Sequence, residues 1–146
     1  MSSFSSIIEV VSVEKTEIID ITPQVNFAVR SSGIRQGIAS IMPLHTTTSI
    51  RINENEPRLI RDFKSFLECL VPCNSRYFHD EIEKRPVPED EKINGHSHIK
   101  SFILGTGETV PVRENSMMLG KWQSVFFVDF DGPQQRKVLV TVIGDK

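Results

Sequence analysis

The sequence predicts one α+β domain over residues 1–146, built on a mainly antiparallel or mixed β-sheet with helices packed on it. Three observations lead to this class. The chain has 146 residues, a length typical of a single domain. Segments rich in β-branched and aromatic residues outnumber segments with helical periodicity. Most of these segments are separated by short turns, which join antiparallel strands.

Each strand is predicted from a short run of β-branched or aromatic residues. The predicted strands cover residues 7–13, 37–44, 46–53, 108–112, 122–130 and 136–144. The turn DGPQQ separates the last two strands, so we expect these two to pair as an antiparallel hairpin.

Three helices are expected between these strands. The first runs from an N-cap at Thr22 to Gly33. The third is SHIKSFILG, read as a helix capped by Ser97 rather than as a strand. The second follows Asn55 as its N-cap. It shows an apolar stripe at helical spacing, formed by Ile60, Phe63, Leu67 and Leu70.

Residues 72–97 are polar and interrupted by prolines. A connection of this length inside a small domain is usually functional or disordered. Cys69 and Cys73 stand just before it, and a single C-x3-C pair is a weak metal or redox signal. We therefore interpret both cysteines as buried or incidental thiols.

The composition argues against two classes of partner. The net charge is −2 and the isoelectric point is about 6.1, whereas broad nucleic-acid binding needs a basic surface. No apolar run approaches the roughly 20 residues of a membrane helix. The first residues also lack the basic and apolar regions of a signal peptide. We expect a cytoplasmic protein with no nucleic-acid or membrane partner.

The four histidines, His45, His79, His96 and His98, each lie beside other polar residues. Three readings are open: metal ligands, acid–base catalysts, or hydrogen-bonded and surface residues. The pair H-x-H at 96–98 points to one side on a strand. On a helix the two side chains point about 200° apart, so only one of them could bind a ligand.

The charged candidates also have structural readings. Asp62 fits a solvated helix position, and Glu54 lies where it would favour the helix dipole. Arg136 follows the DGPQQ turn. It could clamp a phosphate with two hydrogen bonds or simply begin a strand. Residue types alone leave these alternatives open.

Several segments, in order, resemble the YjbQ family, also called UPF0047. They are HTTTSIRINENEP, RDF, YFHDE, NGHSHIKSFILG, VPV, LGKWQSVFFVDFDGP and RKVLVTVIG. The resemblance covers about residues 5 to 144, nearly the whole chain. It implies a YjbQ-like α+β domain that assembles as a homotrimer in the cytoplasm.

The resemblance also implies a site made of histidines and acidic residues. It points to a divalent metal, zinc first and magnesium as the alternative, with His45, His79 and His98 as its ligands. Three carboxylates match acidic positions of the family and are the catalytic candidates: Glu54, Asp62 and Asp80. Arg136 matches a late arginine. His96 falls at a less uniform position, so we assign it only an auxiliary contact.

The activity implied is that of a thiamine-phosphate synthase, an enzyme of transferase type that joins a pyrimidine pyrophosphate to a thiazole phosphate. Its substrates are phosphorylated small molecules, which Arg136, Lys100 and His96 would bind. A three-histidine site suits zinc-activated water better than magnesium–pyrophosphate chemistry. Two alternatives therefore stay open: a zinc-dependent hydrolase of a small substrate, and a non-catalytic trimer that binds a small anion.

Overall fold

Two antiparallel sheets and three α-helices form the chain in the computed structural model, which describes residues 1–146. The α+β class is confirmed. Two short 3₁₀ helices lie between α2 and α3. The elements in chain order are β1 (Ser2–Ser12), β2 (Glu17–Asp20), α1 (Thr22–Ser32), β3 (Gln36–Pro43), β4 (Thr48–Glu54), α2 (Pro57–Leu70), η1 (Phe78–Asp80), η2 (Ile82–Lys84), α3 (Gly95–Leu104), β5 (Glu108–Arg113), β6 (Ser116–Met117), β7 (Gln123–Asp129) and β8 (Gln134–Asp145).

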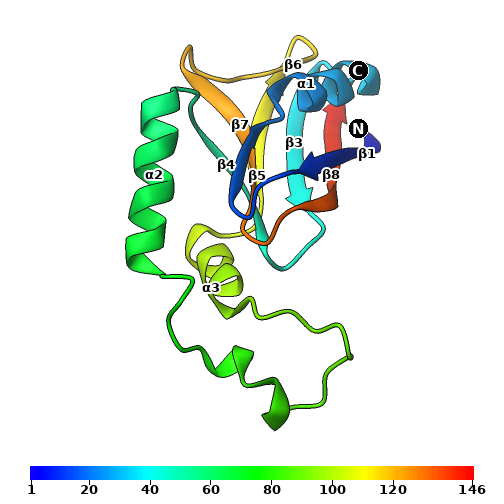
Figure 1. Ribbon diagram of the computed structural model, residues 1–146. Coiled ribbons are helices and arrows are strands. Elements are labelled where there is room, and N and C mark those ends of the chain that lie inside the picture. Colours follow the sequence, from blue (N-terminus) through cyan, green and yellow to red (C-terminus); the bar gives the residue numbers. More distant parts are fainter.

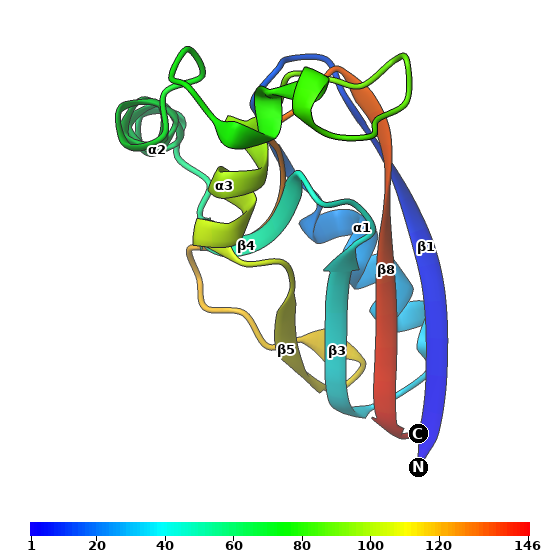
Figure 2. The ribbon, with the colours of Figure 1, turned by 90° about the horizontal axis from the view of Figure 1, so that it is seen from below.

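The first sheet has the strand order β1-β8-β3-β5-β6, and every neighbouring pair is antiparallel. β8 lies between β1 and β3, where Val138 pairs with Ile8 and Val140 with Ile41. Every second side chain over 136–142 is buried, as expected when one face of a sheet meets the core. Helix α1 packs against β1 and β8 and contributes to that core (Figure 2).

The second sheet has the order β2-β7-β4, and its central strand β7 is buried on both faces. Val125 and Phe127 belong to the main core, which lies between the two sheets and α1. Phe126 and Val128 belong to a smaller cluster with Leu67 of α2. A strand covered on both sides reads as an unbroken apolar run, and this explains the sequence SVFFV.

Helix α2 stands beside the second sheet, and residues 71–94 then lead away from the sheets before the chain returns as α3 (Figure 1). We call residues 71–94 the connecting segment. The predicted stripe of α2 is buried at Leu67, but Leu70 is exposed. None of the helices is long and apolar enough to cross a membrane.

Helix α3 is anchored to the ends of the strands by two serines on one face. Ser101 Oγ donates a hydrogen bond to the Thr48 carbonyl at 2.9 Å, and Ser97 Oγ donates to the Phe130 carbonyl at 2.6 Å. The helix begins at Gly95, two residues before the predicted start. Both histidines of the H-x-H pair therefore lie on a helix.

The predicted hairpin between the last two long strands is wrong. β7 pairs with β2 and β4, whereas β8 pairs with β1 and β3, so the turn carries the chain from one sheet to the other. Each strand has two partners far away in sequence. Together these partners occupy both of its edges, and neither edge is left for a hairpin.

Strand β2 is too short and too polar to have been predicted, and two helix caps also differ. Thr22 lies inside α1, where its hydroxyl accepts a hydrogen bond from the Val125 amide. Glu56, rather than Asn55, caps α2 by accepting from the first free amides of that helix. Asn55 instead donates to Asp20.

Candidate functional site

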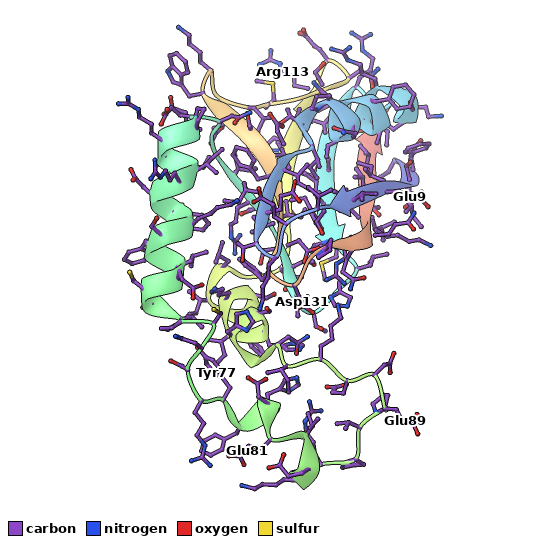
Figure 3. The ribbon with its side chains drawn as sticks, in the orientation of Figure 1. Glu9, Tyr77, Glu81, Glu89, Arg113 and Asp131 are labelled. Atoms are coloured by element: carbon purple, nitrogen blue, oxygen red, sulfur yellow. The ribbon has the colours of Figure 1, made fainter.

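Three of the four histidines line one polar cavity of about 410 Å³. His45 comes from the loop between β3 and β4, His79 from η1 and His98 from α3. Arg136 of β8 and Asp131 of the β7–β8 turn line the same cavity, and no hydrophobic side chain does. Figure 3 shows Asp131 at the end of the sheets that faces the connecting segment. The structure thus brings together four of the predicted site residues.

A buried ion pair supports Arg136. Its Nε lies 2.9 Å from Asp129 Oδ2, and an Nη lies 3.2 Å from Asp129 Oδ1. The two side chains are 6% and 0% exposed. Asp129 also accepts from Ser12 Oγ, and Arg136 donates to the Asp131 carbonyl. A guanidinium held by two bonds to one carboxylate has a fixed orientation, so Arg136 is a rigid part of the cavity wall.

His45 is connected to this ion pair through Thr47. Arg136 donates to Thr47 Oγ1 at 3.4 Å, and Thr47 Oγ1 lies 2.9 Å from His45 Nδ1. The Thr47 amide also donates to Nδ1, so Nδ1 is an acceptor and the hydrogen of the neutral ring lies on Nε2. Burial lowers the pKa of His45, and the Arg136 charge lowers it further. The ring therefore offers a neutral N–H donor.

His79 and His98 both line the cavity, and their rings contact each other. Their ring centroids are 4.6 Å apart, with the rings in an edge-to-face arrangement. Burial and the neighbouring His79 lower the pKa of His98. An Nη of Arg85 lies 3.3 Å from His79 Nε2, and Arg85 also pairs with Glu91. Because a guanidinium only donates, His79 Nε2 is the acceptor in this contact.

Two of these histidines use ring lone pairs in hydrogen bonds within the protein. His45 accepts at Nδ1, and His79 accepts at Nε2, so two of the three rings already use their lone pairs. A ligating imidazole instead binds through a free lone pair and donates from its other nitrogen. No three His, Cys, Asp or Glu side chains are close enough together to hold an ion. Zinc would require His45 and His79 to release these hydrogen bonds.

His96 lies away from the cavity. It is buried, its Nε2 is 3.3 Å from Ser97 Oγ, and its ring lies 6.4 Å from that of Tyr77. Burial lowers its pKa, and the nearby Lys100 lowers it further. Two residues apart on α3, His96 and His98 point in different directions. The structure therefore separates the two histidines that the sequence places together.

Lys100 also lies outside the cavity. Its side chain is 2% exposed, and its Nζ donates to Glu68 Oε2 of α2 at 2.8 Å. The backbone amide of Cys73 donates to the other carboxylate oxygen. These contacts, the amide first, lower the pKa of Glu68 to about 2. Lys100 therefore ties α3 to the end of α2 rather than to a ligand.

The three predicted carboxylates do not gather at the histidines. Asp80 accepts from the Gly95 amide at 2.8 Å and so satisfies the start of α3. Glu54 lies at a separate, mostly apolar cavity between α2 and the second sheet. Asp62 is exposed on α2. The acidic groups that do line the polar cavity include Asp131 and Glu91, which residue types alone did not single out.

Asn94 is the main residue missing from the sequence-based site. It lines the cavity, and its Nδ2 donates to Asp131 Oδ2 at 2.9 Å. Its Oδ1 is buried and has no hydrogen-bond donor. Buried polar atoms nearly always have partners, so this oxygen is a candidate contact for a ligand. Asn94 falls in the polar stretch 72–97, where no sequence pattern singled it out.

Two further hollows adjoin the polar cavity at His98. The first, of about 520 Å³, shares His45 and His98 with it and is bordered by Met42, Leu44 and Phe102. The second, of about 400 Å³, shares His79 and His98 with the cavity, and Tyr77, Phe78 and Phe102 border it. His98 therefore lies where one polar and two less polar spaces meet.

The family model described as "UPF0047 protein YjbQ-like" matches residues 6–145 of this chain. A UPF0047 protein of Methanothermobacter thermautotrophicus is 44% identical over 130 residues, which cover 89% of this chain and 85% of that protein. The UPF0047 protein YugU of Bacillus subtilis is 30% identical over 94% of this chain and 97% of its own length.

Solved structures of similar proteins have the same fold as this chain. A crystal structure from Sulfolobus solfataricus, described as a YbjQ-like protein of unknown function, has a TM-score of 0.90 at 31% identity and covers 99% of both chains. A YjbQ/UPF0047 protein of Clostridium acetobutylicum has a TM-score of 0.84 at 33% identity, covering 94% of this chain and 99% of that one. These matches support both the sheet topology and its connections.

Proposed function

Because this chain belongs to the YjbQ/UPF0047 family, we propose that it is a thiamine-phosphate synthase-like transferase. The reaction joins a pyrimidine pyrophosphate to a thiazole phosphate and releases pyrophosphate. The substrates are phosphorylated small molecules, and the site for them is the polar cavity.

The observation that carries the proposal is the set of hydrogen-bond donors at this cavity. Arg136 is held in place by Asp129, His45 offers Nε2–H, and Lys92 lines the same wall. Fixed donors aimed at developing negative charge lower the barrier for expelling an anion, because they need no reorganisation during the reaction. A departing pyrophosphate is such an anion.

The proposed reaction requires few catalytic groups beyond these donors. The C–O bond to the pyrophosphate breaks, and the thiazole ring nitrogen forms a new C–N bond to the same carbon. No proton has to leave the nucleophile for this bond to form. The chain must hold two substrates next to each other and stabilise the leaving group. An N–H of a substrate would satisfy the unpartnered Oδ1 of Asn94.

The test is a direct assay. Purified protein receives both precursors with Mg²⁺ or Zn²⁺, and thiamine phosphate and pyrophosphate are quantified together. We expect equal amounts of both products, and a large loss of activity in His98→Asn. His96→Gln is the matched control on the same helix, since His96 lies outside the cavity. No thiamine phosphate above the His98→Asn level would end the proposal.

A zinc-dependent hydrolase is the second candidate, favoured by three histidines at one cavity. Elemental analysis of protein purified without chelators tests it, followed by a panel of phosphate esters and carboxylic esters. Zinc at one ion per chain, with hydrolysis lost in His45→Gln, would support it. Tight phosphate binding without turnover of any substrate would instead indicate a small-anion-binding protein.

We also propose a homotrimer located in the cytoplasm. Helix α2 exposes several large apolar side chains, namely Leu59, Phe66 and Leu70, which association would cover. Sedimentation equilibrium gives the mass of the assembly directly. A mass of one or two chains at all concentrations would contradict the trimer.

A further inference from the structure

We propose that Phe102 binds the rings of the substrates beside the polar cavity, so that the site selects small molecules joining an anionic group to a planar ring. This inference rests on the proposed function and adds the surface that recognises the ring. Nothing in the sequence pattern of site residues pointed to Phe102.

The position of Phe102 is the first argument. It lies four residues after His98 on α3, so the two side chains share one face of the helix. Its side chain is 87% exposed. A single exposed phenylalanine is ordinary, but this one borders both hollows that meet the polar cavity at His98. A ring in either hollow would therefore meet the same aromatic side chain.

The lining of the hollows is the second argument. In the larger hollow, Met42 and Leu44 are partly exposed and face the same space as Phe102. Its volume of about 520 Å³ is that of a small-molecule site. Thr46 and Thr106 add hydroxyl groups that can bond to ring heteroatoms. Apolar walls with a few hydroxyls suit a heteroaromatic ring better than a sugar or a bare ion.

The connection between the spaces is the third argument. The larger hollow shares His45, Thr46 and His98 with the polar cavity, so one ligand can extend from one into the other. The smaller hollow joins the cavity at His79 and His98. Two ring sites that both adjoin one anion site would place two substrates next to each other, as a two-substrate transfer needs.

The experiment compares two probes of similar charge by isothermal titration calorimetry. Inorganic phosphate tests the anion site alone, and benzyl phosphate adds one ring. We expect the wild type to bind benzyl phosphate about tenfold more tightly than phosphate, as one aromatic contact permits. In Phe102→Ala this preference should disappear while phosphate affinity stays unchanged. Phe27→Ala is the control, because Phe27 is 73% exposed on α1 and borders neither hollow.

Sedimentation velocity of each variant accompanies the titrations. A ring preference that survives in Phe102→Ala overturns the inference. So does a change of assembly state in that variant with both probes weakened equally, because Phe102 would then be an interface residue. Binding of neither probe removes the anion site on which the inference and the proposed function both depend.

The transferase assay separates the two proposals. A ring preference that depends on Phe102, without thiamine phosphate formation, keeps this inference and ends the proposed function. Thiamine phosphate formation with the same KM for both precursors in wild type and Phe102→Ala keeps the function and ends this inference.

Discussion

His45 and His79 line one cavity but have very different supports. His45 is connected through Thr47 to Arg136 and Asp129, which lie in the core where the two sheets meet. His79 lies on a short 3₁₀ helix and contacts partly exposed Arg85 and Glu91 within the connecting segment. One wall of the site is therefore preorganised, and the other is held by screened surface charges that leave it free to adjust to a ligand.

The largest expected effect is at the rigid wall. Arg136→Met would leave Asp129 buried without its cation, and breaking such a pair costs about 3–5 kcal/mol. Urea unfolding measures the loss of free energy of unfolding. Lys137→Met, at an exposed neighbouring position on β8, is the control and should be close to neutral. A loss below about 1 kcal/mol in Arg136→Met would show that this wall is not held by the pair.

A smaller loss of stability is expected for a substitution at Thr47, which lies between Arg136 and His45. Thr47→Val keeps the shape of the side chain but removes the hydroxyl between Arg136 and His45. The loss should be about 0.5–1.5 kcal/mol, because Arg136 keeps Asp129 and the Asp131 carbonyl as acceptors, and His45 Nδ1 keeps the Thr47 amide as donor. Nitrogen NMR of His45 reports the tautomer. If Nε2 is not the protonated nitrogen in the wild type, the described hydrogen bonding of His45 is wrong.

The base of the connecting segment should show a pH-dependent effect. The pKa of Glu68 is lowered from 4.5 to about 2 in the folded chain, so its contribution to stability is complete above pH 4.5 and is lost as the pH falls toward 2. Glu68→Gln should therefore be less stable than wild type at pH 6 but nearly equal to it near pH 2. Glu68 is about half exposed, so screening keeps the difference small.

Glu89→Gln is the control for that experiment, since Glu89 is an exposed carboxylate that forms none of the ion pairs in the chain. The difference in stability between Glu89→Gln and wild type should not change with pH. A stability difference for Glu68→Gln that stays constant between pH 6 and the acid range would contradict the lowered pKa.

The smallest effect is expected at the adjustable wall. Glu91→Gln weakens the contacts to Arg85 and His79 and should cost only about 0.2–1 kcal/mol, as exposed ion pairs do. Hydrogen exchange of the connecting segment should nevertheless become faster. A loss of stability as large as that of Arg136→Met would mean that both walls are equally rigid.

The periodic parts of the fold could be predicted from the sequence, and the long-range ones could not. The stripe of α2 and the apolar run of β7 are local patterns, and both elements were found. The hairpin prediction failed because a turn signal is local as well, whereas β8 finds its partners in β1 and β3, up to 142 positions away in the pair Ser2 and Gly144. The local sequence does not specify which strands β8 pairs with.

The site shows the same division. The resemblance identified His45, His79, His98 and Arg136, and the structure places them at one cavity. Lys100 looked like a phosphate contact because its partner Glu68 lies 32 residues earlier and no local pattern links them. The roles of His96 and His98 depended on whether α3 was a helix, and the H-x-H spacing alone leaves that open. Asn94 was missed because its distinguishing feature, a buried side-chain oxygen without a hydrogen-bond donor, can be recognised only in the folded structure.

The place of β8 has a consequence for how the chain folds. It is the last strand in sequence, yet it lies between β1 and β3 in the first sheet. During synthesis β1 has no neighbour in this sheet until residues 134–145 leave the ribosome, so the first sheet cannot close before then. Pairing over such separations is slow. Arg136 belongs to this strand, and the polar cavity is therefore among the last features to form.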